Sequence, residues 1–276
     1  MSNKILITGG NGKTARRVAE RLSALNQEFI SVSRSSTPSF DWYDPSTWKE
    51  VLNGVSKVYI TFQPDLAVPA SVDIIKAFVE ASKQAGVKHL VLLSGRGEHE
   101  AQACEKLVMD SGIDWTIVRA SWFMQNFSES FLLDGVMAGE VILPVINHKE
   151  PFVDTDDIAA VVVEALLNKE HSRQLYELTG PELMSFKEAV EQISAVTGRS
   201  IIFKEIPMQD YVEMLRGYQL PEDYIWLIGY LFTEVLDGRN ESIVDDVEKI
   251  TGRKPRSFET YAKQAHASGA WNLTNV

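Results

Sequence analysis

The sequence predicts an α/β protein with a doubly wound parallel sheet and a smaller, mostly helical C-terminal region. Three observations predict it. Short apolar runs alternate with helical segments in the first half, a glycine-rich turn follows the first run, and helices dominate after about residue 120. Runs that are apolar throughout are typical of strands buried on both faces of a parallel sheet. We therefore expect a core over residues 1–120 and a second region over 121–276 that packs partly on the core.

Strands and helices are expected to alternate along the first half. The predicted strands are Lys4–Thr8, Phe29–Ser33, Lys57–Phe62, His89–Ser94 and Trp115–Arg119. The predicted helices are Lys13–Leu25, Pro45–Leu52, Pro69–Ala85 and Glu100–Ser111. Proline is tolerated where a helix begins, and glycine is common where one ends, which suits Pro45, Pro69, Gly86 and Gly112.

The second half carries five predicted helices and few strand signals. The helices are Asp156–Leu167, Ser185–Thr197, Pro221–Leu236, Ser242–Thr251 and Phe258–Ala267. The first of them can pack back on the sheet, and Tyr176–Leu178 can add a strand to it. The tail, about Ser268–Val276, looks loose.

Composition excludes several classes of function. The chain has 276 residues and a formal net charge of −11, which disfavours nucleic acid as a partner because phosphate binding needs clustered Lys and Arg. Its single cysteine, Cys104, permits no internal disulfide and suits a reducing cytoplasm. The N-terminus resembles no targeting signal, and no apolar run approaches the roughly 20 residues that span a bilayer. We expect a soluble, cytoplasmic protein without a membrane partner.

A glycine-rich turn follows the first predicted strand and opens the first predicted helix. Glycine lets the backbone turn tightly and approach a pyrophosphate, and the helix N-terminus offers free N–H groups and a positive dipole end. A plain turn before a helix is the alternative, but the strand–turn–helix context favours a Rossmann-type dinucleotide site. The predicted cofactor contacts in this turn are Thr8, Gly9, Gly10, Asn11, Gly12, Lys13, Thr14 and Ala15.

The choice of cofactor is read at the end of the second predicted strand. NAD enzymes usually place an acid there for the ribose 2′-hydroxyl, but no Asp or Glu occurs between Glu28 and Asp41. Arg34 can instead pair with a 2′-phosphate and Ser35 can donate a hydrogen bond to it, with Lys13 as a possible second charge. A solvated surface arginine is the alternative. The segment favours NADP(H) over NAD(H).

At this point the chain resembles the NmrA-like proteins, an atypical branch of the short-chain dehydrogenase/reductase superfamily. The resemblance covers nearly the whole chain, and within the family Ser33–Ser36 with Phe40–Trp42 looks most like the ergot-alkaloid reductases and their bacterial relatives. It rests on the glycine turn, on Val87–Ser94, Trp122–Phe127 and Phe152–Ala159, and on Leu178–Glu182 and Thr251–Phe258.

The resemblance implies an NADPH-dependent reductase of a C=N or iminium bond, and it assigns further site residues. Asp41 and Trp42 are expected to border the adenine. Phe62, Gln63 and Pro64 are expected to line the cofactor, and Ser94 and Gly95 to lie near the nicotinamide.

The proton-donor motif of typical short-chain dehydrogenases, Tyr-x-x-x-Lys, is absent from this sequence. None of the eight tyrosines precedes a lysine by four residues, and none lies between Tyr59 and Tyr176, where the motif belongs. In that motif the lysine lowers the tyrosine pKa so that the phenol can exchange a proton. Two explanations remain open. An iminium acceptor needs no acid when it receives a hydride and a quinone can draw its proton from water, or the protein senses NADP(H) without catalysis.

Few side chains are left as candidates for the chemistry. Ser94, at the end of a predicted strand, is the candidate catalytic residue, with a structural role as a cap equally open. Glu98, His99 and Glu100 are conceivable proton donors, but residues that open a helix are more often solvated. His148 is expected in a loop. No Cys/His spacing indicates a metal site.

The predicted substrate contacts follow the strand Trp115–Arg119. They are Trp122, Phe123 and Asn126, where aromatic side chains can form an apolar box for a flat or cationic small molecule, or can be ordinary core. The apolar stretch Tyr224–Phe232 either caps the substrate or forms a homodimer interface. We thus expect an NADPH-dependent reductase of a small organic imine, iminium compound or quinone; the rival is a non-catalytic NADP(H)-sensing regulator.

Overall fold

The computed structural model describes residues 3–145 and 147–273, which pack as two compact units. The first unit contains Met1–Ala120, Thr155–Leu178 and Asp245–Arg253. The second contains Ser121–Asp154, Thr179–Val244 and Lys254–Val276. Each unit is therefore assembled from segments that are far apart in the sequence. The chain passes from the first unit to the second after residue 120, and it later returns to the first unit for residues 155–178 and 245–253.

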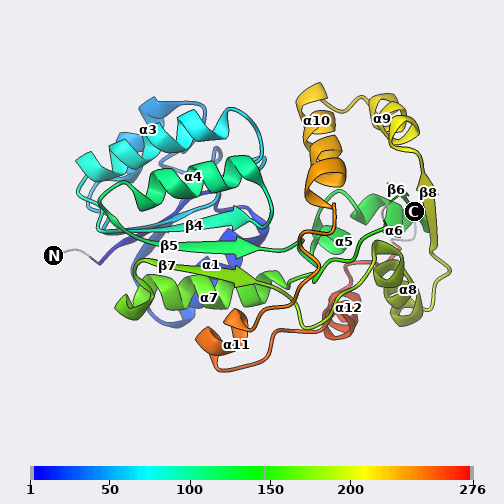
Figure 1. The fold of residues 1–276 in the computed structure, drawn as a ribbon. Coiled ribbons are helices and arrows are strands. Elements are labelled where there is room, and N and C mark those ends of the chain that lie inside the picture. The colour runs from blue at the N-terminus through cyan, green and yellow to red at the C-terminus, as the bar shows by residue number, and fades with distance from the viewer. Residues whose placement is uncertain (1–2, 146, 274–276) are drawn as a thin grey trace. The chain divides into compact units, whose positions relative to one another are not determined.

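The first unit is built on a six-stranded parallel sheet, so the predicted doubly wound α/β class is confirmed (Figure 1). The strand order is β2-β1-β3-β4-β5-β7, and the chain reverses direction across the sheet between β1 and β3. Ligands of such sheets bind at the carboxyl ends of the strands beside this reversal. The strands are β1 (Ile5–Ile7), β2 (Phe29–Ser31), β3 (Lys57–Ile60), β4 (His89–Gly95), β5 (Asp114–Ala120) and β7 (Gln174–Leu178).

Helices cover both faces of this sheet. In Figure 1, α3 and α4 lie on one face, and α1 and α7 lie on the other. Helix α1 turns Val18 and Leu22 inward, and α7 is buried along most of its length, as its apolar sequence requires. These helices are α1 (Lys13–Ala24), α3 (Ser71–Gln84), α4 (His99–Met109) and α7 (Thr155–Leu167). Shorter elements of the unit are η1 (Pro45–Thr47), α2 (Trp48–Val51), η2 (Lys169–His171) and α11 (Asp246–Thr251).

The second unit contains a two-stranded parallel sheet that the sequence did not predict. Strand β6 (Glu140–Pro144) pairs in register with β8 (Ile202–Ile206). The strands are short. Every position of β8 is exposed or half-buried, and the strand includes Lys204 and Glu205, so it lacks the continuous apolar run of a buried strand. Its helices are α5 (Asn126–Glu129), α6 (Leu133–Ala138), α8 (Phe186–Thr197), α9 (Met208–Gly217), α10 (Glu222–Tyr230) and α12 (Phe258–Ala267).

Three sequence predictions need correction. The helix predicted from Ser242 begins only at Asp246, because the preceding backbone is tied to the Thr179 hydroxyl, which accepts from Val244 N at 3.1 Å. The helix predicted to reach Leu236 ends its α-helical part at Tyr230 and continues as a π-helical turn, η3 (Leu231–Val235). The predicted loose tail is wrong for Trp271, which is 1% exposed and donates from Nε1 to Phe127 O at 2.9 Å. The last three residues lie outside the described chain.

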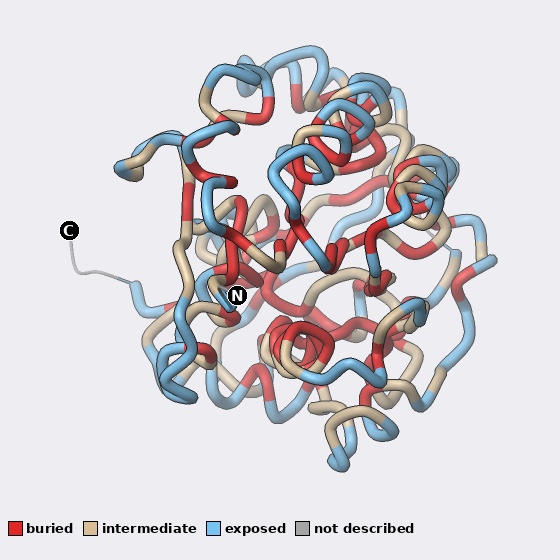
Figure 2. Tube along the Cα trace, turned by 90° about the vertical axis from the view of Figure 1, so that its left-hand side faces the viewer, coloured by how far each residue is buried: buried red, intermediate tan, exposed pale blue. Residues whose placement is uncertain are grey.

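Each unit has its own apolar interior. Figure 2 shows buried segments running through the inside, with exposed turns at the periphery. The core of the second unit includes aromatic side chains packed edge to face at 5.0–5.7 Å, an arrangement that aromatic rings prefer. These central rings are Phe127, Phe152, Phe186 and Phe258.

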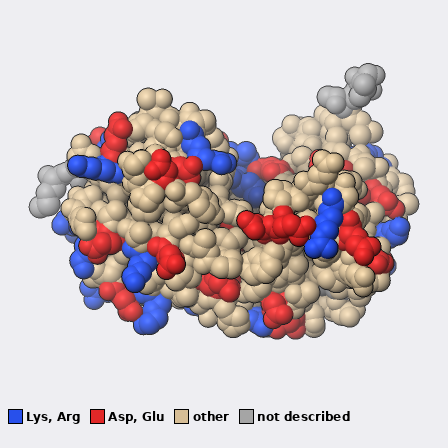
Figure 3. Space-filling view, turned by 90° about the horizontal axis from the view of Figure 1, so that it is seen from above, with Lys and Arg blue, Asp and Glu red and all other residues tan. Residues whose placement is uncertain are grey.

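The surface agrees with the charge composition. On the face in Figure 3, acidic and basic side chains are interspersed. Among the described residues no helix is long and apolar enough to cross a membrane.

Candidate functional site

The glycine turn after β1 has the tight geometry that its sequence predicts. Gly9 adopts a positive φ of 64°, and a Cβ there would lie 2.3 Å from Thr61 Oγ1. A Cβ on Gly10 would meet Ser31 Oγ at the same distance. The turn is closed by Gly12 N, which donates to Gly9 O at 2.7 Å. A side chain is therefore disfavoured at Gly9 by packing and by backbone conformation, and at Gly10 by packing.

The turn delivers the chain into α1 with its N-terminus uncapped. Gly12 is the N-cap, and in the described chain no side chain caps this helix and no acid lies in its first turn. The first N–H groups of α1 and its positive dipole end are thus available to an anion. Below them, Thr14 accepts from the buried Tyr59 hydroxyl at 3.1 Å, and the Thr8 hydroxyl donates to Tyr59 O at 3.1 Å. Ala15 is fully buried, which allows the helix to approach the sheet closely.

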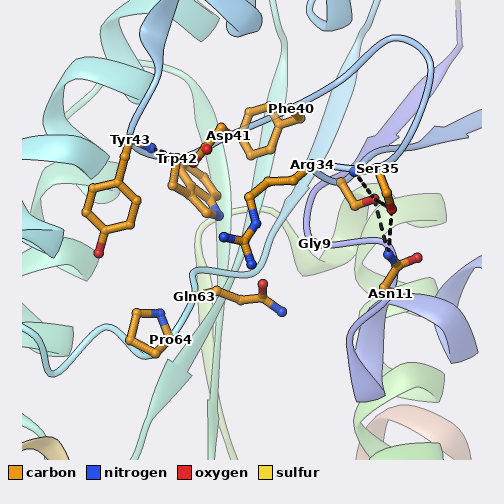
Figure 4. Close-up of a pocket in the computed structure, with 11 residues that line it drawn as sticks. Gly9, Asn11, Arg34, Ser35, Phe40, Asp41, Trp42, Tyr43, Gln63 and Pro64 are labelled. Atoms are coloured by element: carbon orange, nitrogen blue, oxygen red, sulfur yellow. Dashed lines mark hydrogen bonds between the residues drawn. The ribbon is translucent and has the colours of Figure 1, made fainter. Parts of the chain in front are cut away.

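Polar side chains converge where β2 ends (Figure 4). Asn11 Nδ2 donates to Ser33 Oγ and Ser35 Oγ, each at 3.2 Å. Arg34 extends beside this cluster toward Gln63, as Figure 4 shows. Among the described residues no carboxylate pairs with Arg34, although the chain carries a large excess of acids. An exposed guanidinium without a protein partner, next to hydroxyl and amide groups, is suited to a phosphate.

These groups line a cavity of about 690 Å³ at the carboxyl ends of β1, β2 and β3. Its remaining wall is aromatic. Trp42 is held by a hydrogen bond from Nε1 to Thr61 O at 3.0 Å, and it packs on Phe62 with 5.2 Å between ring centroids. Tyr43 is 59% exposed at the rim, and its backbone N donates to Asp41 Oδ1 at 3.0 Å. The cavity therefore combines a cationic, hydrogen-bonding end with a flat apolar wall.

The cavity brings together about half of the cofactor residues predicted from sequence. Of those, the lining residues are Gly9, Asn11, Arg34, Ser35, Asp41, Trp42 and Gln63. Pro64, which the resemblance also implied, is part of the wall. Thr8, Thr14 and Ala15 lie beneath the turn as supports. Lys13 acts electrostatically on Asp65, which follows β3.

Three lining residues were not predicted from the sequence. Ser33, Phe40 and Tyr43 complete the wall. Ser33 and Phe40 belong to segments that the sequence analysis had already singled out. Tyr43 is the real omission, and its only sequence signal is its place directly after Asp41 and Trp42.

Ser94, at the end of β4, belongs to a buried ionic network. Its hydroxyl donates to Glu105 Oε1 at 2.6 Å. The carboxylate of Glu105, which is 1% exposed, also accepts from Arg119 Nε and Nη2 at 2.7 and 2.6 Å. Arg119 continues to Glu177 at 3.5 Å. A hydroxyl committed to a buried carboxylate favours the structural alternative for Ser94.

Glu98, just before α4, is buried, so the expectation that it is solvated is wrong. It is 7% exposed, and its carboxyl group occupies the place of the missing side chain of Gly95, where a Cβ would lie 1.9 Å from Glu98 Oε1. Burial raises the pKa of Glu98 well above its ordinary value, and the charge of Asp65 raises it further. Sequence position alone could not find this group, because exposure is decided by the fold.

The predicted substrate contacts lie in the second unit and are all half-buried. Trp122 packs on Phe186 and on Phe232, each at 5.2 Å between centroids. Phe123 bridges to Val153, and Asn126 opens α5. In α10, Ile225 and Ile228 face the unit's core, and Trp226 is 44% exposed and stacked on Tyr230. His148 lies in a loop, as predicted, and contacts Glu241 at 2.8 Å.

Comparison with known proteins places this geometry in a family. The chain is similar to agroclavine dehydrogenase of Claviceps fusiformis, with 31% identity covering 93% of this chain and 95% of that protein. It is similar to an NAD(P)H azoreductase of Xenophilus azovorans, with 30% identity covering 96% and 98%. Among solved structures, the triphenylmethane reductase of Citrobacter sp. in complex with NADP(H) has the same fold, with a TM-score of 0.80, 19% identity and coverage of 95% and 99%. A sequence profile of the NmrA-like family matches residues 38–262, and the chain belongs to this family.

Proposed function

We propose that this protein is an NADPH-dependent reductase of a small organic molecule. The observation that carries the proposal is Arg34, a guanidinium without a carboxylate partner among the described residues, at the end of β2 in the cavity. No acid takes the position at which NAD enzymes bind the ribose 2′-hydroxyl. The positive charge of Arg34 and the hydrogen-bonding groups beside it thus fit a 2′-phosphate, which NADP(H) carries and NAD(H) lacks.

Different residues of the cavity and the turn would bind different parts of the cofactor. Arg34 and Ser35 would bind the 2′-phosphate, with the adenine between Asp41 and Trp42. The turn from Gly9 to Ala15 would bind the pyrophosphate at the N-terminus of α1. Phe62 and Gln63 would line the cofactor, and Gly95 would lie near the nicotinamide, because a dinucleotide crosses the reversal of strand order between β1 and β3. Bound NADPH would supply a hydride to the substrate.

The relatives support a reductase over a purely sensory role. The names of two of them, an agroclavine dehydrogenase and an NAD(P)H azoreductase, are those of oxidoreductases. The missing Tyr-x-x-x-Lys motif argues against simple ketone chemistry. We therefore propose an imine or iminium substrate first and a quinone second, contacted by Trp122, Phe123 and Asn126. Their partial exposure in the structure is compatible with that role.

Two measurements test the proposal. Calorimetry is expected to show tighter binding of NADPH than of NADH. NADPH oxidation is then followed by its near-ultraviolet absorbance with cyclic imines, iminium salts, azo compounds and quinones, and at least one class is expected to be reduced. Equal affinity for the two cofactors would contradict the assignment of Arg34. Tight NADPH binding without reduction of any acceptor would favour the regulator.

A further inference from the structure

Two carboxyl groups meet at the carboxyl edge of the sheet, next to the strands that flank the cofactor cavity. Asp65 follows β3 and Glu98 follows β4, and each is the other's hydrogen-bonding neighbour. Asp65 Oδ1 also accepts from Ala67 N at 2.9 Å. By contrast, Glu98 Oε2 is buried and has no hydrogen-bond donor among the described residues. A buried carboxylate next to a second, half-buried one cannot ionise at low cost, so the pair needs a proton.

The proton belongs on Glu98 because the surroundings of the two groups differ. Asp65 has a backbone N–H donor and the positive charge of Lys13 nearby, and both favour its ionised form. Glu98 faces the negative charges of Asp65, Glu100 and Glu105. Burial and these charges together raise the pKa of Glu98 well above its ordinary value. A neutral carboxylic acid is a hydrogen-bond and proton donor at neutral pH.

A glycine leaves open the space that the Glu98 carboxyl occupies. The Glu98 carboxyl lies against the Cα of Gly95, in a space that any other residue at position 95 would fill with its Cβ. Gly95 is the last residue of β4, beside Ala120 of β5. This edge is where the nicotinamide half of a dinucleotide is expected, given that Arg34 lies at the end of β2 on the other side of the strand reversal.

We propose that Glu98 is a proton donor for reduction, with Asp65 as the residue that positions it and shares its proton. The proposal rests on the reductase function proposed above. When a quinone receives a hydride from NADPH, one substrate oxygen gains negative charge. The Glu98 O–H bond breaks, its proton bonds to that oxygen, and the electron pair stays on the Glu98 carboxylate. Solvent then returns one proton, so that quinone, NADPH and H⁺ become hydroquinone and NADP⁺.

The proposal separates neutral from cationic acceptors. A quinone, azo compound or neutral imine needs a proton when it is reduced, whereas an iminium or a cationic triarylmethane dye becomes neutral on receiving hydride alone. Glu98 is therefore needed for the first group and dispensable for the second. For the first group, turnover is expected to fall as the pH rises through the pKa of Glu98, because the donor form is lost.

The test uses Glu98→Gln, whose amide can still donate to Asp65, and Glu50→Gln on the exposed surface of α2 as the matched control. With the wild type, a quinone and a cationic triarylmethane dye are each assayed over a range of pH. We expect Glu98→Gln to slow quinone reduction by at least about tenfold, toward the 10²–10⁴-fold that a general acid contributes, and to leave dye reduction within about twofold. Equal loss on both acceptors, or loss on neither, would overturn the proposal.

A second readout needs no turnover. The infrared spectrum of the wild type at neutral pH is expected to contain a protonated carboxyl band that Glu98→Gln lacks and Glu50→Gln retains. Identical spectra for wild type and Glu98→Gln would mean that Glu98 is ionised, and the proposal would be wrong. A wild type that binds NADPH and reduces neither acceptor would instead contradict the reductase function itself, and the donor role would fall with it.

Discussion

The polar groups at two parts of the same sheet edge differ in whether they are paired within the protein. At the ends of β1 and β2, Arg34, Ser35 and Asn11 line an open cavity, and the guanidinium has no carboxylate partner among the described residues. At the ends of β4 and β5, Ser94, Glu105 and Arg119 satisfy one another in the interior.

The difference shows which polar groups await a ligand. A charge that the fold itself needs is paired and buried, because an uncompensated buried charge is costly. A charge left unpaired at a cavity contributes nothing to the fold and is available for binding. Glu98 differs from this network, since it is buried but one of its oxygens has no donor within the part of the chain that the structure describes.

The largest effect is expected from a substitution in the buried network at the ends of β4 and β5. Arg119→Leu leaves the Glu105 carboxylate buried without its partner, and we expect the free energy of unfolding to fall by about 3–5 kcal/mol in urea titrations. Arg173→Leu, which removes an exposed pair with Asp114, is the control and is expected to have little effect. NADPH affinity, measured where Arg119→Leu is still folded, is expected to stay within about threefold of wild type. A stable Arg119→Leu variant would contradict the structural role of the network.

The next largest effect is expected from a substitution in the glycine turn beside the cavity. A Cβ on Gly12 would point between Gly9 O at 3.0 Å and Gln63 Nε2 at 3.7 Å, so Gly12→Val places a branched side chain where the pyrophosphate is expected. Calorimetry is expected to show at least about a hundredfold loss of NADPH affinity, roughly 2.7 kcal/mol, with an unchanged circular dichroism spectrum. Gly229→Ala, in an open position on α10, serves as the control. Retained NADPH binding by Gly12→Val would show that the turn is not the site.

A smaller change sharpens the assignment of Arg34. Arg34→Ala removes the charge-assisted contact and is expected to weaken NADPH binding by about ten- to hundredfold, or 1.5–3 kcal/mol, and to leave NADH binding unchanged. Lys49→Ala, an exposed cation on α2, separates this local effect from that of net charge. If both arginine and lysine variants weaken NADPH equally, Arg34 has no specific role.

The smallest expected effect concerns Ser94. Ser94→Ala removes one hydrogen bond to Glu105 while Arg119 still pairs with that carboxylate, so stability is expected to fall by roughly 1 kcal/mol and turnover by less than about tenfold. Thermal unfolding and NADPH oxidation measure the two effects on one preparation. Abolished turnover with intact NADPH affinity would instead make Ser94 a catalytic group.

The sequence by itself determined the class of fold and predicted the turn with which the proposed cofactor site begins. Continuous apolar strands, the glycine turn and Arg34 are local signals, because a buried parallel strand and a turn with positive φ each restrict the residues at their own positions. The strands of the six-stranded sheet were predicted within about two residues. The resemblance to the NmrA-like family rested on the glycine turn and on further segments along nearly the whole chain, and the family profile matches residues 38–262.

Only the tertiary structure decided which polar groups are paired, buried or free. Ser94 and Glu105 lie eleven residues apart, and Arg119 completes their network from the next strand. The Glu98 carboxyl lies against Gly95, and it interacts with Asp65, which follows a different strand. The pairing of β6 with β8 and the burial of Trp271 are equally non-local. The exposure and the partners of a side chain depend on all the neighbours that the fold brings around it. No pattern within a single segment of sequence contains that information.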